Sequence, residues 1–357
     1  MTPRERMIAA ITHQPVDRVP TDLWAQPKVY AKLREHFGAN ANLWAKLRID
    51  GIPYVRPKYV GPPRSEAPEG CITDHWGICH RRAGQQGGEG TQYEQLSWPL
   101  AEAQTIDDLE TYNWPRLEWF DVSEMCPEAE RLQETHLVMC GYMAPFYYHS
   151  LLRGPARALA DPVERPEFTH FFLDRLTETF LSIHRRYFET CRGLIDVAQV
   201  TDSFGGPQGP VLSLEIFREF YKPHLQRCID LCHEFGLKVF HHDTGSIRPL
   251  LPELVELGID ILNPVAPDCP DMAPAQVKQE FGSKLCFHGG IDSQGALLRG
   301  TPAEVRQAVR ASIDALAADH TGYILAPCEC LAAQTPVDNI VALYDEAWKY
   351  GKVDGKN

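Results

Sequence analysis

The feature that most constrains the fold is a regular alternation of short apolar runs and longer amphipathic segments after residue 122. The apolar runs predict strands at 136–141, 194–200, 238–241, 260–262, 284–287 and 322–325. The longer segments predict helices at 168–191, 213–235, 247–257, 274–281, 301–318 and 336–350. Strands that alternate with helices in this way belong to a parallel sheet whose connections are helical crossovers.

The N-terminal part is less regular. A helix is expected at the start, because Thr2, Pro3 and Glu5 supply an N-cap, a first-turn proline and a capping-box acid. A short strand at 19–24 and a helix at 28–37 follow. From there to Pro115 the chain is rich in proline and glycine, which predicts inserted loops and hairpins. We expect one domain over residues 1–357, with 56–98 as a hairpin or flap.

Two architectures fit this pattern, an open doubly wound sheet and a closed barrel. The open sheet would be favoured by a Gly-x-Gly-x-x-Gly turn after an early strand, and the sequence has none. Polar residues follow directly on the predicted strands, at 201–203, 242–244, 263–264, 288–292 and 328–330. In a (β/α)8 barrel such positions converge on one mouth. The expected fold class is therefore α/β, a (β/α)8 TIM barrel.

Composition excludes several classes of protein. No run of about 18 apolar residues is present and the first residues are charged, which predicts a soluble, cytoplasmic chain without a membrane partner. The net charge is −13 and the basic residues are scattered, so nucleic acid is not an expected partner. The eleven unevenly spaced cysteines suit free thiols in a reducing compartment better than a disulfide framework.

The pair His241-His242 ends one predicted strand. Adjacent strand residues point to opposite sides, and we expect His242 to face the barrel lumen as a catalytic residue. A purely structural hydrogen bond is the alternative role. Asp243 is a candidate for substrate binding, or else a cap for the helix that follows Gly245.

A second cluster is Cys328-Glu329-Cys330. Two thiols beside a carboxylate, joined by a histidine from another strand, would form a three-ligand zinc site with an open position. The candidate ligands are His242, Cys328 and Cys330, and Glu329 is a candidate catalytic residue. The alternative is two packed cysteines around a hydrogen-bonded glutamate.

The remaining strand ends add further candidates. His288 and Asp292 flank two glycines, as a proton donor and a substrate anchor. Asp202 precedes two glycines at another strand end and is the fourth catalytic candidate. Asn263 and Trp24 are candidates for substrate binding. Tight turns that require glycine and aspartate would explain several of these residues without any chemistry.

Several longer segments resemble one known superfamily. They are 202–205 (Asp-Ser-Phe-Gly), 217–223 (Phe-Arg-Glu-Phe-Tyr-Lys-Pro), 236–242, 260–265, 287–292 and 335–339, together with 4–6 and 17–20 near the start. On these residues the chain resembles uroporphyrinogen decarboxylase and the related methylcobamide methyltransferases over nearly its whole length. The resemblance implies a (β/α)8 barrel that is often dimeric, so a homodimer is expected.

The decarboxylase branch of this superfamily carries arginines in a Trp-x-x-Arg-Gln-Ala-Gly-Arg loop after its first strand. The matching stretch here is Trp24-Ala25-Gln26-Pro27, which contains no arginine. Arginine pairs with carboxylates through two parallel hydrogen bonds, and a substrate with many carboxylates needs such partners. The resemblance therefore argues against uroporphyrinogen itself as the substrate.

The methyltransferase branch binds zinc through a His-x-Cys pair and a later cysteine. This chain keeps His242 but has Thr244 in place of the cysteine, with Cys328 or Cys330 as the later thiol, so the zinc site is altered or absent. The resemblance implies a corrinoid-dependent methyltransferase-like enzyme that methylates a thiol or another small-molecule acceptor, the corrinoid coming from a partner protein. The alternatives are a decarboxylase of a tetrapyrrole or smaller acid, and a non-catalytic binder of a tetrapyrrole or corrinoid protein.

Overall fold

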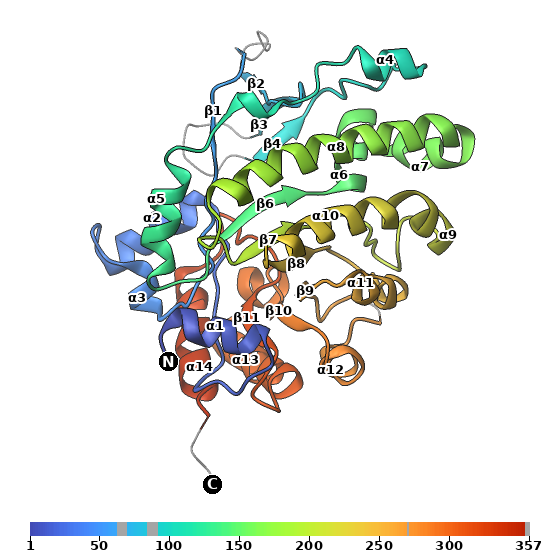
Figure 1. Ribbon diagram of the computed structural model, residues 1–357. Helices are drawn as coiled ribbons and strands as arrows, with labels where there is room; N and C mark the ends of the chain where they lie inside the picture. The colour runs from blue at the N-terminus through green and yellow to red at the C-terminus, as the bar shows by residue number, and fades with distance from the viewer. Residues whose placement is uncertain (63–69, 84–91, 270, 354–357) are drawn as a thin grey trace.

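A six-stranded parallel sheet forms most of the barrel wall (Figure 1). The computed structural model describes residues 1–62, 70–83, 92–269 and 271–353. The strands lie in the order β6-β7-β8-β9-β10-β11, so each strand is the neighbour of the next one in the chain. Their bounds are β6 Met139–Met143, β7 Val197–Val200, β8 Lys238–His242, β9 Ile261–Val265, β10 Cys286–Ile291 and β11 Tyr323–Pro327.

Two irregular N-terminal segments, 20–25 and 50–55, close the gap between β11 and β6. In the first, Thr21 forms a parallel bridge with Leu325 of β11. In the second, the backbone N–H groups of Asp50 and Gly51 donate to the carbonyl of Thr21, and Tyr54 forms a parallel bridge with Met139 of β6. The strand predicted at 19–24 thus exists as isolated bridges. These eight neighbours confirm the expected α/β barrel.

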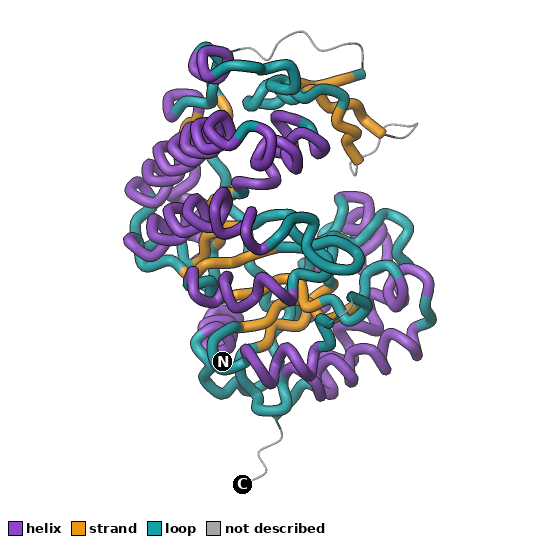
Figure 2. Tube along the Cα trace, turned by 90° about the vertical axis from the view of Figure 1, so that its right-hand side faces the viewer, coloured by secondary structure: helices purple, strands orange, loops and turns teal. Residues whose placement is uncertain are grey.

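Helices surround the strands (Figure 2). Those of the regular part are α8 Pro166–Thr190, α9 Leu214–Ile216, η2 Phe217–Tyr221, α10 Lys222–Glu234, η3 Arg248–Leu250, α11 Leu251–Leu257, α12 Pro274–Phe281, η4 Gly295–Arg299, α13 Pro302–Leu316 and α14 Val337–Tyr350. The N-terminal half contributes α1 Pro3–Ile11, α2 Pro27–Phe37, α3 Leu43–Leu47, α4 Ile106–Glu110, η1 Leu117–Trp119, α5 Met125–Gln133, α6 Pro145–Arg153 and α7 Pro155–Glu164. The helix predicted at 213–235 is therefore three consecutive elements.

The inside of the barrel is filled by one apolar layer. Inward-facing side chains from the strands and from segment 50–55 pack together there, each 5% exposed or less: Ile52, Met139, Val197, Phe240, Ile261, Cys286 and Ile324. The next inward positions along β8, β9 and β10 are two residues further on, because side chains alternate across a strand. Those positions hold His242, Asn263 and His288, so a polar layer lies directly above the apolar one.

The strands run further toward their carboxyl ends than the sequence predicts. His242, Asn263 and His288 lie inside β8, β9 and β10, whereas the predicted strands stop just before them. His242 is paired with Asn263, and His288 with Ile324. The ladder hydrogen bonds use backbone groups alone, so they continue where the side chains change from apolar to polar.

The segment 56–98 contains short antiparallel pairings outside the barrel. β1 Lys58–Tyr59 pairs with β5 Phe120–Asp121. A separate three-stranded sheet consists of β2 Cys71–Thr73, β3 Cys79–Ala83 and β4 Gln92–Gln95. In Figure 1 this sheet lies at the top of the molecule, above α6 and α8.

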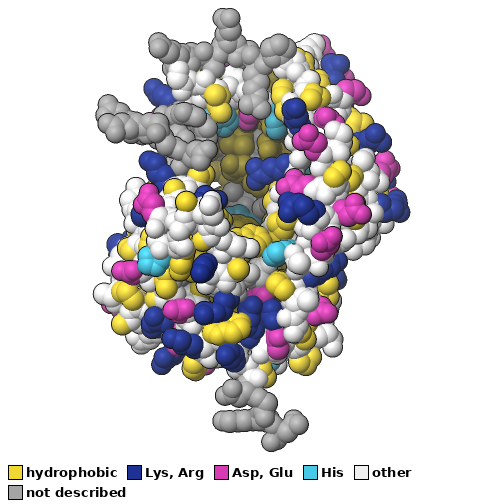
Figure 3. Space-filling model, turned by 90° about the vertical axis from the view of Figure 1, so that its left-hand side faces the viewer, with side chains coloured by type: hydrophobic (Ala, Val, Ile, Leu, Met, Phe, Trp, Pro, Cys, Tyr) yellow, Lys and Arg dark blue, Asp and Glu magenta, His cyan; other side chains and the backbone are white. Residues whose placement is uncertain are grey.

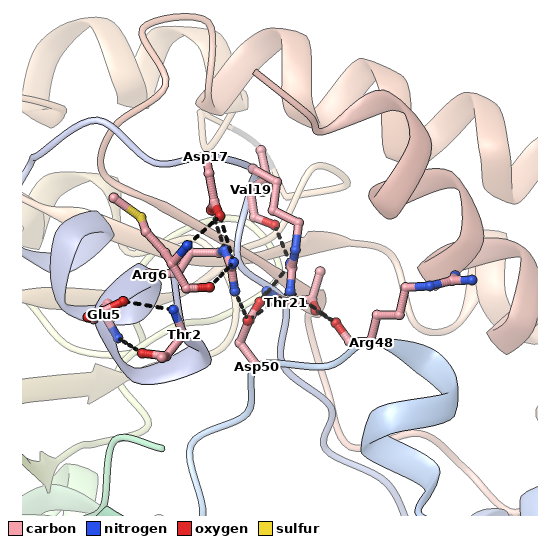
Figure 4. Close-up of polar contacts among 10 residues, drawn as sticks. Thr2, Glu5, Arg6, Asp17, Val19, Thr21, Arg48 and Asp50 are labelled. Carbon is pink, nitrogen blue, oxygen red and sulfur yellow. Dashed lines mark hydrogen bonds and ion pairs between the residues drawn. The ribbon is translucent and has the colours of Figure 1, made fainter. Parts of the chain in front are cut away.

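A largely buried cluster of charges, with Asp17 at its exposed edge, joins helix α1 to the two closing segments (Figure 4). The carboxylate of Asp50 is fully buried and accepts hydrogen bonds from Arg6 at 2.5 Å and from Arg18 at 2.8 Å. It also accepts the backbone N–H of Thr21 at 3.0 Å. Arg6 in turn donates to Asp17, and this contact holds the pKa of the Asp17 carboxyl well below its usual range. We call Arg6, Asp17, Arg18 and Asp50 the closing cluster.

One cysteine expectation is wrong. Cys126 and Cys191 form a disulfide that joins α5 to the end of α8, whereas the other nine cysteines form no disulfide, as expected. The two residues are 65 positions apart in sequence, and only the fold brings their Cα atoms to 5.1 Å. No helix in the described part of the chain is both long enough and apolar enough to span a bilayer.

Candidate active site

A line of hydrogen-bonded side chains crosses the mouth of the barrel. It begins on segment 20–25, passes through β10, β9 and β8, and ends on the loop after β11. We call it the polar relay, and its members in order are Asp22, His288, Asn263, His242, Thr244 and Glu329. Four of the predicted site residues are therefore brought together, and two further members, Asp22 and Thr244, were not predicted as site residues.

The inner half of the polar relay fixes the orientation of His242. Nδ1 of His242 lies 2.5 Å from Oδ1 of Asn263, and since this oxygen only accepts, Nδ1 carries a proton. The amide nitrogen of Asn263 donates to Nδ1 of His288 at 2.7 Å. His288 then donates from Nε2 to Asp22 at 3.0 Å. All three partners are buried, so the ring and the tautomer of His242 are set by the protein interior.

The outer half of the polar relay is accessible to solvent. Nε2 of His242 lies 3.2 Å from the hydroxyl of Thr244, which donates to the Glu329 carboxylate at 2.7 Å. His242 and Glu329 are half-buried and Thr244 is exposed. His241 faces the other side of the sheet, is fully buried, and contacts the carbonyl of Val200. The imidazole available for chemistry is therefore that of His242.

Two predicted carboxylates lie beside the polar relay and bind backbone groups. Asp202 accepts the N–H groups of Phe146 and Tyr147 at the start of α6. Asp243 accepts those of Phe204 and Gly205, which holds the loops after β7 and β8 together. Burial raises the pKa of Asp202 well above its usual value and that of Asp243 to about 7. In this geometry both residues position loops.

Asp292 has a similar local role. Its Oδ1 accepts the N–H groups of Gln294 and Gly295, both at 2.8 Å, at the start of η4. The neighbouring Gly289 and Gly290 have φ values of +114° and +86°. A Cβ at Gly290 would lie 2.4 Å from the hydroxyl oxygen of Ser312, so close packing requires glycine there.

The three predicted metal ligands are not gathered at one point. The Cys328 thiol is buried and donates to the carbonyl of Val265, and burial raises its pKa. Cys330 is exposed, and His242 has Asn263 and Thr244 as its hydrogen-bond partners. Among the described residues no group of three His, Cys, Asp or Glu side chains is placed to hold a metal ion. The geometry does not fit the expected zinc site, and zinc binding stays a prediction.

A large cavity adjoins the polar relay. It has a volume of about 840 Å³ and lies between the barrel mouth, helices α6 and α8, and the segments around β1 and β5. Figure 3 faces a hollow between the upper and lower parts of the molecule, with apolar side chains inside it and basic ones at its rim. Trp24 lines the cavity, and its ring centroid lies 5.9 Å from that of His242 and 5.5 Å from that of His288. Trp24 therefore connects the cavity with the polar relay.

Sequence reasoning missed Asp22 and the cavity wall. Asp22 interrupts an apolar run at 19–24, and a charged residue inside a predicted strand was the available signal. For the aromatic residues of 54–76 the sequence predicts loops and hairpins, because nothing in the local pattern shows that these residues face the barrel mouth. Cys330 was predicted as a metal ligand and instead lines the cavity.

Comparison with known proteins agrees with this architecture. A methyltransferase from Methanosarcina mazei has a similar fold, with a TM-score of 0.68 and 18% identity over 98% of this chain and 99% of its own. A B12-independent methionine synthase from Shewanella sp. W3-18-1 is less similar, with a TM-score of 0.41 and 13% identity over 63% of this chain and 65% of its own. At 18% identity the likeness to the Methanosarcina methyltransferase shows the fold alone. No curated protein sequence matches the chain.

The sequence itself matches one family profile, described as Uroporphyrinogen decarboxylase (URO-D), over residues 91–350. This range contains β6 to β11 and every predicted site residue except Trp24. It leaves out both closing segments, 20–25 and 50–55. Asp22 and Trp24 both lie in the first of them. Since the match spans well over half of the sequence, the chain belongs to the uroporphyrinogen decarboxylase family.

Proposed function

We propose that this protein transfers a methyl group to a small-molecule acceptor bound beside Trp24, with the polar relay as its acid–base machinery. The observation that carries the proposal is the fixed His242 imidazole, whose Nε2 faces the Thr244 hydroxyl, which in turn donates to the Glu329 carboxylate. The likeness to the Methanosarcina methyltransferase over almost the whole chain supports the reaction class. The fold itself hosts many reactions, so the residues of the site have to support the reaction class.

The polar relay can take up a proton and hold it. Because Nδ1 of His242 is occupied by Asn263, the free electron pair of the neutral ring is on Nε2. An acceptor with a thiol or hydroxyl group would lose its proton to this nitrogen as the acceptor atom bonds to the methyl carbon and the donor leaves. The protonated Nε2 then donates to Thr244, and Thr244 to Glu329, whose negative charge stabilises the imidazolium.

The methyl donor is proposed from the family resemblance. A methylated corrinoid on a partner protein would supply the methyl group as a co-substrate. The corrinoid-protein partner and the homodimer stay predictions.

A carboxy-lyase reaction on a small acid is the second candidate. It is favoured by Arg56, a cation at the edge of the cavity that can bind a carboxylate. In that reaction the proton on Nε2 of His242 would move to the carbon that loses carbon dioxide. The same relay serves both reactions, with the proton travelling in opposite directions.

Turnover by a His242→Gln variant tests the role of the polar relay. The purified protein would be given methylcobalamin with a panel of thiols and phenols, and separately a panel of small acids, while demethylation and carbon dioxide release are followed. We expect one of the two activities, reduced by about 10²- to 10⁴-fold in His242→Gln. His233→Gln, at a half-exposed histidine of α10, is the matched control and should keep full activity.

Asp22→Asn tests whether the polar relay acts on protons, because a merely structural role of Asp22 would not change the pH profile of kcat. The amide at position 22 no longer favours the Nε2–H form of His288, so the pH profile of kcat should shift while KM stays the same. Equal turnover by the native protein and His242→Gln would contradict the proposal. Ligand binding without turnover in either assay would favour the non-catalytic binder.

A further inference from the structure

The wall of the cavity is unusually aromatic. More than a third of the described lining residues are Phe, Tyr or Trp, against 10% in the whole chain. The rings contact each other across different elements: Trp76 lies 4.6 Å from Tyr148 of α6 and 5.5 Å from Phe180 of α8, centroid to centroid. Rings that support each other edge to face have few alternative rotamers, so the wall is already shaped for a flat partner.

The charge of the cavity has one sign. Its described lining contains no Asp, Glu or Lys, although the chain as a whole has a net charge of −13. Arg56 is the arginine of this lining, and its guanidinium lies 4.7 Å above the ring of Tyr54. Tyr54 is held in turn by a hydrogen bond from its hydroxyl to the carbonyl of Gly141 at 2.7 Å. Among the described residues Arg56 forms no ion pair with a carboxylate, so its charge is left for a ligand.

A buried donor lies in the same wall. Trp76 is 4% exposed, and its indole N–H has no hydrogen-bond acceptor of good geometry among the described residues. Buried N–H groups in folded proteins nearly always have a partner. This N–H is covered by neighbouring protein atoms, so a ligand oxygen would reach it only after the wall shifts.

We propose that the cavity binds a planar aromatic acid of two or more fused rings, with its rings between the aromatic side chains and its carboxylate or phenolate on Arg56. The proposal deepens the proposed function, because it names the substrate class of the same site. The aromatic wall selects for flat rings, and the unpaired guanidinium selects for an anion.

The size of the cavity sets the number of rings. A volume of about 840 Å³ is in the upper part of the range found for drug-sized ligands, about 300 to 1,000 Å³. A single benzoate would leave much of the aromatic wall without contacts. This shape also differs from that of a substrate with many carboxylates, because a single guanidinium pairs with one of them.

Equilibrium binding of 9-anthracenecarboxylate to the full chain tests the proposal, with fluorescence anisotropy as the readout. The neutral 9-anthracenemethanol and the cationic 9-anthracenemethylammonium are measured in the same way, and the non-aromatic, non-fluorescent cyclohexanecarboxylate is measured by its displacement of 9-anthracenecarboxylate. We expect the aromatic carboxylate to bind at least about tenfold more tightly than each of the other three.

Two arginine variants locate the anion. Arg56→Met should weaken binding of 9-anthracenecarboxylate by about tenfold, and Arg56→Lys should weaken it less. Arg192→Met is the matched control, because Arg192 is also exposed and stacks on an aromatic ring, 4.8 Å above Phe235, at a distance from the cavity. Its binding should equal that of the native protein. Thermal unfolding of each variant verifies that the fold is intact.

The inference would be overturned by equal binding of the acid and the alcohol, by unchanged binding in Arg56→Met, or by no binding of any aromatic probe. These outcomes are separate from a failure of the proposed function. His242→Gln should keep most of its affinity for 9-anthracenecarboxylate even where turnover is lost, because the aromatic wall and Arg56 bind the rings and the anion. Normal binding together with unchanged turnover in His242→Gln would refute the acid–base role and leave the ligand class intact.

Discussion

The two halves of the barrel are built differently, and they contribute different parts of the site. From β8 to β11 each strand pairs with the next in a parallel ladder, with one register shift between β9 and β10 at Phe287–Gly289. These strands carry His242, Asn263 and His288 of the polar relay. Segments 20–25 and 50–55 contact their neighbours mainly through isolated bridges, and they lead into the aromatic cavity. Regular strands place hydrogen-bonding atoms with little freedom, while inserted segments give the cavity its shape.

The irregular half needs another source of cohesion. The closing cluster supplies it, because Asp50 binds two arginines and the backbone of Thr21 at the point where the two segments meet. A buried carboxylate that satisfies two cations is costly to remove, since Arg18 then remains buried without its carboxylate and Arg6 keeps only Asp17.

Breaking the closing cluster should therefore give the largest effect. We expect Asp50→Ala to lower the free energy of unfolding by about 3–5 kcal/mol, measured by urea denaturation. Arg6 and Arg18, each less than 10% exposed, would be left with a buried positive charge.

The matched control is Asp345→Ala, which removes the partner of Arg48 from an exposed ion pair. It should cost less than about 1 kcal/mol, because exposed pairs are well solvated. If the two variants lost similar amounts of stability, the closing cluster would not be what holds the irregular half together.

The same contrast explains what the sequence could predict. The regular half repeats an apolar run followed by polar residues, so its strands, its helices and the residues His242, Asn263, His288 and Glu329 were all identified from local pattern. Their mutual contacts follow from the parallel order of the strands. The roles of Asp202 and Asp292 could not be read in this way, because a carboxylate that binds backbone N–H groups has the same sequence signature as a catalytic one.

Features that depend on distant parts of the chain were beyond local pattern. Asp22 binds His288 across 266 positions, and the Cys126–Cys191 disulfide spans 65. Arg56 and Trp76 lie in a proline- and glycine-rich stretch whose path has no periodic signal. Their meeting at one cavity is a property of the closed barrel.

The stability of the cavity wall should depend on pH through one buried histidine. His184 of α8 is buried, accepts the N–H of Tyr142 at 3.0 Å, and has its pKa lowered to about 4 by burial. The unfolded chain binds a proton at this histidine near pH 6.5, so it gains protons before the folded state does. Stability from this group is complete above pH 6.5 and is lost as the pH falls toward 4, by up to about 3 kcal/mol.

His184→Gln should reduce this slope, because an amide can still accept the Tyr142 N–H but does not titrate. The measurement is the free energy of unfolding in urea at pH 7, 5.5 and 4.5. His233→Gln, at a half-exposed histidine, is the control and should keep the native slope. An unchanged slope in His184→Gln would mean that this histidine is protonated as easily in the fold as outside it.

The smallest expected effect concerns metal binding in the regular half. The Thr244 hydroxyl oxygen lies 3.2 Å from Nε2 of His242 and 2.7 Å from Oε1 of Glu329, so it occupies the point between an imidazole and a carboxylate. A neutral hydroxyl is a poor zinc ligand, and zinc prefers thiolate, imidazole and carboxylate. We therefore expect weak zinc binding in the native protein.

Thr244→Cys puts a thiol between the imidazole of His242 and the carboxylate of Glu329, where the outer half of the polar relay lacks a zinc ligand. Three donors of the preferred kinds would then come from β8, the loop after it and the loop after β11, and zinc affinity should rise measurably in a titration against a chromophoric chelator. Adding His242→Ala to this variant should abolish the gain, whereas Cys330→Ala, at an exposed thiol outside the relay, should leave it unchanged. If neither the native protein nor Thr244→Cys binds zinc, the polar relay is a set of hydrogen-bonding groups for an organic substrate. In that case His242 acts on protons alone, and the ligand class set by the cavity decides the reaction.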